Sequence, residues 1–280
     1  MKKIIVAPDS FKGSLTSAEV ADAVERGIKD VFPQCNVVKA GVADGGEGTV
    51  EAIVKAVGGD MYAASVTDPL GRPVKAAYGI VRSGGVKTAV MEMSAASGLP
   101  LLLPDELNPW ITSTYGTGEM ISDALNRGCR KFLVGIGGSA TNDAGTGMLS
   151  ALGVRFLDSR GQRLKGCGRD LESIARIDMS SLMPAARESE FIVACDVNTP
   201  FCGPDGAARV FAPQKGADPQ TAEALDRGMR SFARVIAEQF QTDIVPLSGA
   251  SAAGGLGGAF KAFLNARLTA GIEMVLDAIA

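Results

Sequence analysis

Residues 131–147, KFLVGIGGSATNDAGTG, constrain the fold of this chain more than any other segment. A short apolar run predicts a buried strand, the glycines after it predict a tight turn, and the pattern then becomes helical. A strand that enters a glycine-rich turn and opens a helix is typical of phosphate sites in α/β proteins, because backbone N–H groups and the helix dipole converge there. Asn142 and Asp143 stand at the helix entrance. A carboxylate beside a phosphate needs a cation between them, so this loop predicts a metal-bound phosphate and phosphoryl transfer.

Two further strand–loop–helix units precede this loop. Lys3–Val6 and Val37–Val42 are predicted strands, and helices are expected at Thr16–Asp30 and Val50–Val57. This repetition predicts a doubly wound parallel sheet. After residue 63 the pattern changes to short strands separated by the turn sequences DPLGRP and RSGG, which predict an antiparallel meander. We therefore place a domain change near that residue.

Composition excludes several classes of function. The net charge of −3 argues against a general affinity for nucleic acid or anionic membranes. The five cysteines form no CxxC pair, which is typical of free thiols in a reducing compartment, and no signal peptide or membrane span is recognisable. We therefore expect a cytoplasmic protein. Because the chain has no histidine, a Ser-His-Asp triad is excluded and a general base must be Asp, Glu, Lys, Tyr or Cys.

Polar loops follow the first two predicted strands, at the position where α/β proteins bind ligands. APDSFKGSLTS combines a lysine with serines and predicts an anion site, and ADGGEGT surrounds two glycines with carboxylates suited to Mg²⁺ or a substrate hydroxyl. The candidate residues of these two loops are Asp9, Ser10, Lys12, Ser14, Asp44, Gly45, Gly46 and Glu47. The alternative is structural, since Glu47 also suits the first turn of a helix and Lys12 alone also suits the surface.

Two candidates lie further along the chain. Asp196 directly follows the apolar run FIVAC and is a candidate general base or metal ligand, with Asn198 just beyond it. An Asx turn would explain Asp196 equally well. Lys215 follows the apolar run VFAP and could bring an ammonium group to a phosphate.

The glycine-rich loop of residues 135–147, called the central loop below, also allows a different class of function. Gly135, Gly137 and Ala140 match the pattern G-x-G-x-x-A, and Asp158 follows about 20 residues later, as in a dinucleotide fingerprint. An NAD(P)-dependent oxidoreductase is therefore an alternative, although Asp143 would then face a pyrophosphate without a metal ion. A turn whose glycines serve packing alone is the third interpretation.

Taken together, five loops resemble the type I glycerate kinases of bacteria. They are APDSFKGSLTS, ADGGEGT, GIGGSATNDAGTG, ACDVNTPFCGPDGAARVFAPQKGAD and GASAAGGLGGAF, and the similarity runs from residue 2 to residue 280. The resemblance implies ATP-dependent phosphorylation of D-glycerate with Mg²⁺, giving 2-phosphoglycerate in preference to the 3-phosphate. It also implies a flavodoxin-like domain of residues 1–63 and 268–280, an inserted α/β domain of residues 64–267 containing the meander, and an active site between them.

Residue chemistry and loop position then suggest roles. We expect Asp196 to orient or deprotonate the substrate hydroxyl, and Lys12 or Lys215 to bind the glycerate carboxylate or the transferred group. The predicted metal ligands are Asp44, Glu47 and Asp143. The remaining residues expected to bind substrate or phosphate are Gly137, Gly138, Ser139, Thr141, Asn142 and Asn198.

Glycerate kinases of this type continue beyond the point at which this sequence stops. The final segment, GIEMVLDAIA, is apolar and helical in pattern. We therefore expect the C-terminal part of the flavodoxin-like domain to be largely missing, and an inactive glycerate-binding fragment is the third functional hypothesis. Product regiochemistry, a homodimer and the pathway are left open by the sequence.

Overall fold

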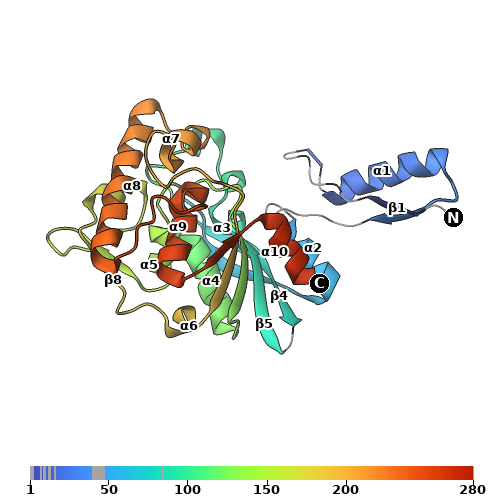
Figure 1. Cartoon of the computed structure of the whole chain (residues 1–280), viewed down its shortest axis with the longest axis horizontal. Helices are drawn as coiled ribbons and strands as arrows, with labels where there is room; N and C mark the ends of the chain where they lie inside the picture. Colours follow the sequence, from blue (N-terminus) through green and yellow to red (C-terminus); the bar gives the residue numbers. More distant parts are fainter. Residues whose placement is uncertain are drawn as a thin grey trace.

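The structure is a computed structural model that describes residues 3–6, 8, 11, 14–15, 17–39, 48–83 and 85–279 (Figure 1). Its strands are β1 (Lys3–Val6), β2 (Asn36–Lys39), β3 (Gly59–Thr67), β4 (Pro73–Ser83), β5 (Val86–Glu92), β6 (Lys131–Gly135), β7 (Arg155–Leu157), β8 (Arg176–Asp178), β9 (Glu190–Ala194) and β10 (Arg267–Thr269). Its helices are α1 (Ser17–Val31), α2 (Thr49–Val57), α3 (Ser94–Ser97), α4 (Tyr115–Asn126), α5 (Thr146–Ala151), α6 (Pro184–Arg187), α7 (Ala207–Phe211), α8 (Pro219–Phe240), α9 (Ala252–Leu264) and α10 (Gly271–Ile279). The predicted α/β class is confirmed.

The first two strands form a small unit of their own. β1 pairs in parallel with β2, and α1 makes the connection that a parallel pair requires. Lys39 holds α1 against β2 through ion pairs with Asp22 at 2.7 Å and Glu25 at 2.9 Å. In Figure 1 this unit projects from the main body on the side where α2 and α10 lie, away from the large sheet. The predicted strand Lys3–Val6 and the helix after it are confirmed.

A six-stranded sheet in the order β10-β9-β6-β5-β4-β3 organises the rest of the chain. β3, β4 and β5 pair antiparallel, which confirms the predicted meander, whereas β5, β6, β9 and β10 run parallel. β3 continues through residue 63 and β10 pairs with β9 within this sheet. The domain limits expected at residues 63 and 268 stay a prediction.

Both faces of this sheet are covered. Because successive side chains of a strand point to opposite faces, Leu133 of β6 faces α2 and α10 while its neighbours Phe132 and Val134 join the larger core on the other face. A strand buried on both sides is expected to be continuously apolar, as β6 and β9 are. The buried residues on the α2 and α10 side are Val50, Ile53, Val81, Val90, Leu133, Ile192, Ala194, Met274 and Val275.

The larger core lies against the helices of the opposite face. Phe132 of β6 stacks on Phe191 of β9 with ring centroids 4.7 Å apart. α8 contributes a buried stripe at helical spacing, as expected for an amphipathic helix that packs on a core. The members of that stripe are Leu225, Met229, Phe232 and Ile236.

The segment GASAAGGLGGAF was expected to be a loop, and this prediction is wrong from residue 252 onward. It forms α9, but Ala253, Gly254 and Gly255 have left-handed backbone angles inside it. The resulting kink brings the chain against the central loop, where Ala144 N donates to Gly254 O at 3.0 Å. A Cβ atom on Gly254 would lie 2.2 Å from Thr141 O, so a glycine is required for this approach.

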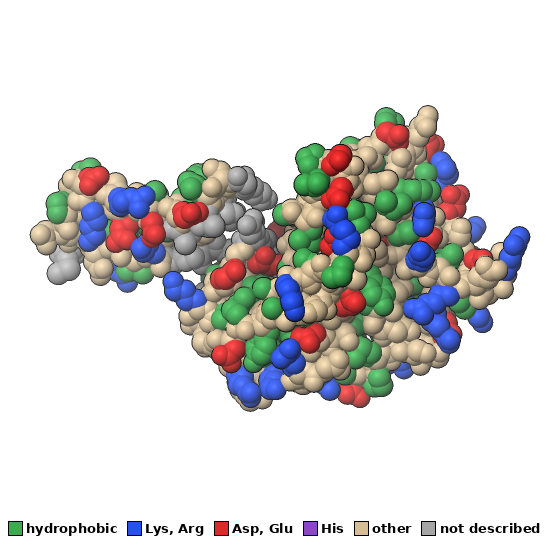
Figure 2. All heavy atoms as spheres, turned by 180° about the vertical axis from the view of Figure 1, so that it is seen from behind, with side chains coloured by type: hydrophobic (Ala, Val, Ile, Leu, Met, Phe, Trp, Pro, Cys, Tyr) green, Lys and Arg blue, Asp and Glu red, His purple; other side chains and the backbone are tan. Residues whose placement is uncertain are grey.

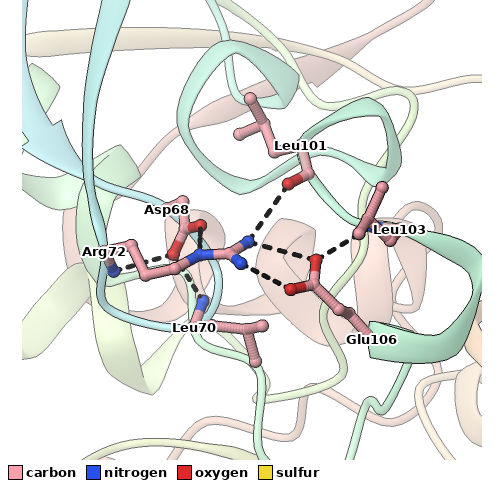
Figure 3. Close-up of polar contacts among 6 residues, drawn as sticks. All are labelled: Asp68, Leu70, Arg72, Leu101, Leu103 and Glu106. Atoms are coloured by element: carbon pink, nitrogen blue, oxygen red, sulfur yellow. Dashed lines mark hydrogen bonds and ion pairs between the residues drawn. The ribbon is translucent and has the colours of Figure 1, made fainter.

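A cluster of charges ties the β3–β4 turn to the segment that follows α3 (Figure 3). Arg72 contacts Asp68 and Glu106, each at 2.5 Å. That segment in turn reaches the central loop, because Leu99 N donates to Gly138 O at 2.9 Å. The meander therefore supports one side of the central loop, through the segment that follows α3.

Two expectations from composition can be compared with the structure. The structure pairs none of the five described cysteines in a disulfide, which agrees with the prediction. No helix in the described ranges is both long and apolar enough to cross a membrane.

Candidate functional site

Three candidate groups lie at the carboxyl ends of neighbouring strands. Glu92 is the last residue of β5, Gly137 and Gly138 follow β6, and Asp196 follows β9. Glu92 pairs in register with Gly135, and Gly135 with Ala194, so the three segments meet at one edge of the sheet. Because neighbouring strands are about 4.8 Å apart, the two carboxylates flank the glycines across roughly 10 Å.

Most of the central loop is buried, whereas the sequence predicted a loop open to a phosphate. Gly137 and Gly138 are exposed, whereas residues 139–150 are buried. No described residue accepts a hydrogen bond from the N–H groups of Gly137 and Gly138, and Gly138 has a φ of 72°. Backbone donors that are adjacent and free form an anion-binding concavity. The predicted phosphate position at the helix entrance does not fit, because α5 has six residues and its first turn is buried.

Lys215 fixes this loop from within. Its side chain is 2% exposed, and Nζ donates to Ser139 Oγ and to Thr141 O, both at 2.7 Å. Burial lowers the pKa of Lys215 to about 7, against the opposing attraction of Asp143. With its ammonium enclosed in this way, Lys215 is placed to hold the loop in shape.

Asp143 is the centre of a second buried network. Its Oδ2 accepts from Thr114 N at 2.7 Å, Thr114 Oγ1 at 2.8 Å and Gly147 N at 3.2 Å, and its Oδ1 accepts from Gly145 N at 3.0 Å. Burial raises the pKa of this carboxyl group, and these donors oppose the rise. Since the chain itself satisfies the carboxylate oxygens, the geometry supports a role in fixing the loop.

Two polar atoms of the same loop are buried without a hydrogen-bond partner among the described residues. They are Thr141 Oγ1 and Asn142 Oδ1, and Asn142 Nδ2 lies 3.3 Å from Met229 Sδ. The structure thus brings Thr141 and Asn142 together with Ser139, Asp143 and Lys215. It places all five behind the two exposed glycines.

Asp196 and Asn198 lie beyond β9 on the exposed side of the edge. Oδ1 of Asp196 accepts from Gly271 N at 3.2 Å, so the carboxylate meets the first turn of the nine-residue helix α10. Asn198 Oδ1 accepts from Ser248 Oγ at 2.7 Å. The exposed carboxylate of Asp196 keeps further acceptor positions for a substrate hydroxyl.

Sequence reasoning missed Glu92. Its half-buried carboxylate accepts from Val50 N at 3.1 Å at the start of α2. Burial raises the pKa of Glu92 to about 7, and the neighbouring charge of Glu51 adds to the rise, whereas the N–H groups at the start of α2 oppose it. The signal was present, because Glu92 follows the apolar run TAVM as directly as Asp196 follows FIVAC.

Most of the candidate residues in the first two predicted loops lie outside the described residues. Ser14 is described, is exposed, and donates its backbone N–H to Phe11 O at 2.8 Å. Among the described residues, no three His, Cys, Asp or Glu side chains are grouped to hold a metal ion. The predicted site residues that lie outside the described residues are Asp9, Ser10, Lys12, Asp44, Gly45, Gly46 and Glu47.

Replacing Glu92 by Gln is expected to remove a pH dependence of folding. The folded protein holds the Glu92 proton up to about pH 7, above the ordinary value of 4.5, so stability falls as pH rises between these values. The loss for the wild type is at most ~3 kcal/mol. Chemical denaturation at pH 4.5 to 7.5 measures it, with the exposed and distant Glu188→Gln as the matched control. Equal slopes in wild type and Glu92→Gln would refute the assignment.

Comparison with known proteins now adds to this geometry. The model of the glycerate kinase family matches residues 4–280. Glycerate kinases of Haemophilus influenzae and Bacillus subtilis are each 48% identical over 98% and 99% of this chain, which spans 72% of either relative. A crystal structure of a protein provisionally named glycerate kinase 2, from Salmonella typhimurium LT2, matches with a TM-score of 0.88 and 46% identity. That match covers 99% of this chain and 74% of the other.

Proposed function

The chain belongs to the glycerate kinase family, and from this membership we infer that it is a kinase that transfers phosphate from ATP to glycerate. The observation that carries the inference is the 48% identity to glycerate kinases across nearly the whole chain. A relative from Escherichia coli, 46% identical, is named glycerate 2-kinase, which supports 2-phosphoglycerate as the product. We take D-glycerate as the substrate enantiomer.

We place the transfer at the edge formed by Glu92, Gly137, Gly138 and Asp196. The free N–H groups of Gly137 and Gly138 would donate to phosphate oxygens of ATP. A bond forms between the glycerate hydroxyl oxygen and the γ-phosphorus, and the bond between that phosphorus and the β–γ bridging oxygen breaks. ADP leaves with that oxygen, and the hydroxyl proton passes to the carboxylate of Asp196.

We propose that Mg²⁺ accompanies ATP at this edge. Mg²⁺ is usually held by one or two carboxylates together with substrate phosphates, so a preformed cluster of three acidic residues is not required. Glu92 fits this donor set once ionised, whereas the carboxylate of Asp196 is assigned to the hydroxyl proton. Asp44 and Glu47 stay proposed ligands, whereas the occupied oxygens of Asp143 fit poorly. When bound, the ion would neutralise charge on the phosphates.

Lys215 would then act by positioning Ser139 and Thr141 behind the glycines, without touching the substrate. Lys12 stays our proposal for binding the glycerate carboxylate. We further propose that the protein acts on small molecules in the cytoplasm, with neither nucleic acid nor membrane as a partner. Its net charge of −3 and its free thiols support this, and a homodimer is compatible with it.

The oxidoreductase alternative finds no support in the geometry. A dinucleotide fingerprint presents a pyrophosphate to the N-terminus of a long helix. Here Ala140 is fully buried, and the following helix has six residues. The glycines of this loop therefore do not form the dinucleotide-binding turn that the fingerprint predicts.

The assignment is tested by incubating the protein with ATP, Mg²⁺ and D-glycerate. We expect ADP and one phosphoglycerate, and phosphorus NMR should show the 2-phosphate ester. L-glycerate and glycolate are the matched substrate controls, and omission of Mg²⁺ with a chelator tests the metal. Formation of ADP without any phosphoglycerate would show ATP hydrolysis, and saturable binding of NADH without turnover would favour the oxidoreductase; either result contradicts the proposal.

A further inference from the structure

A cavity of about 500 Å³ opens at the opposite end of the parallel strands from the glycines. Asp60 and Tyr62 of β3, Arg82 of β4, Lys87 of β5 and Arg127 after α4 contribute to its lining. Lys87 stands near the start of β5, whereas Glu92 ends it at the phosphoryl-transfer edge. Five residues of strand at about 3.3 Å each separate the two ends by roughly 16 Å, so the cavity is a distinct location.

Two of its cations face each other without an acidic partner. Arg82 and Lys87 are directly opposite in the β4–β5 ladder. Like charges in this position repel and weaken a hairpin. Within the described ranges, no carboxylate lies within ion-pair distance of either cation, and Lys87 Nζ donates to the carbonyl oxygen of Arg127 at 2.8 Å. An unpaired cation pair at a cavity wall suits an anionic ligand.

Arg127 is held in place and still has donors to offer. Its Nε donates to Asp123 Oδ2 at 2.8 Å, and its guanidinium carbon lies 4.8 Å from the centre of the Tyr62 ring. The Tyr78 hydroxyl also interacts with this guanidinium, and the remaining N–H groups belong to an exposed side chain that lines the cavity. A guanidinium fixed in this way loses little freedom when it binds phosphate.

A fourth cation lies close to the same group. Burial raises the pKa of the Cys129 thiol, and the positive charges of Lys87, Arg130, Arg127 and Arg82 all oppose that rise. All four cations therefore lie near this thiol. Figure 2 shows Lys and Arg side chains gathered at the lower edge of the main body, where Figure 1 places the tip of the β4–β5 hairpin.

We propose that this cavity binds a small organic molecule carrying two phosphate groups. Arg82, Lys87 and Arg127 bind the phosphates, and the Asp60 carboxylate accepts hydrogen bonds from hydroxyl groups of the same ligand. The volume lies within the range of small-molecule sites. Occupation also relieves the repulsion between Arg82 and Lys87, so the ligand stabilises the folded protein.

The test measures binding of fructose 1,6-bisphosphate to the whole chain by calorimetry, with the phosphoryl-transfer site filled by a non-hydrolysable ATP analogue and Mg²⁺. Arg82→Gln and Lys87→Gln should each weaken binding about tenfold or more, since each removes a charged hydrogen bond. Lys75→Gln, an exposed lysine of the same strand β4, is the matched control and should bind as the wild type does. Phosphate alone should bind more weakly than the bisphosphate.

Folding of the variants is checked by their melting temperatures, which should stay close to that of the wild type. Each substitution removes a like-charge repulsion, and in Lys87→Gln this offsets the lost hydrogen bond to Arg127 O. Absence of saturable binding at millimolar ligand, or equal affinity in the wild type, Arg82→Gln and Lys87→Gln, would overturn the proposal. An equal loss in Lys75→Gln would overturn it too, since it would show a response to net charge alone. Glycerate phosphorylation is not the readout, so the proposed function can fail or stand independently.

Discussion

Replacement of Asp196 by Asn is expected to lower kcat for glycerate phosphorylation by ~10²–10⁴-fold, the usual range for loss of a general base. Asn keeps the size of the side chain and an oxygen that can accept from Gly271 N, so the start of α10 should remain intact. It removes the group that would accept the hydroxyl proton. KM for ATP should change little, since the proposed phosphate donors are the backbone N–H groups of Gly137 and Gly138.

The matched control for this variant is Asp218→Asn. Asp218 also caps a helix, accepting from Thr221 N at 2.7 Å at the start of α8, and it lies outside the proposed site. Single-turnover kinetics with circular-dichroism melts separate the two roles. A loss below about tenfold in Asp196→Asn, well under the range for a general base, would mean that Asp196 serves α10 alone. A comparable loss in Asp218→Asn would point to a general effect of removing a cap.

The elements of the sheet could be predicted because their signals are local. Continuous apolar runs identify β6 and β9 as buried strands, and the turn sequences between β3, β4 and β5 identify the meander. The carboxyl ends of parallel strands meet at one edge, so a polar residue directly after an apolar run is a candidate for the site. That rule selected Asp196, and applied equally to the run TAVM it would also have selected Glu92.

The burial of the central loop could not be predicted from its own residues. Lys215 lies 74 residues from Thr141, and Gly254 approaches the same residue from still further along the chain. Nothing local in GSATND tells a loop that is open to a phosphate from one covered by distant segments. The helix α9 could not be predicted for the same reason. Its kink depends on its own glycines, but its helical conformation depends on packing against other segments.

Lys215→Met is the second substitution with a large expected effect. Methionine fills a similar volume but cannot donate, so Ser139 Oγ loses a partner and Thr141 O is left buried without its ammonium donor. A displacement of about 1 Å in a positioned loop can cost ~10²-fold in rate, and we expect kcat/KM for ATP to fall by about that factor. The matched control is Lys75→Met, which should keep full activity. In the wild type, the exposed Nζ of Lys75 also contacts a serine hydroxyl.

The same substitution should also change how the free energy of unfolding depends on pH. The change has the opposite sign to that expected for Glu92, and it identifies the buried ammonium group. Burial lowers the pKa of Lys215 from 10.5 to about 7, so between these values the unfolded chain binds more protons than the folded one. The free energy of unfolding of the wild type should therefore rise with pH over this window, by at most ~1.4 kcal/mol per pH unit. Lys215→Met should lack this rise while Lys75→Met keeps it. If Lys215→Met follows the pH profile of the wild type, the buried lysine does not titrate as assigned. If Lys215→Met keeps the kcat/KM of the wild type, the lysine does not position the loop.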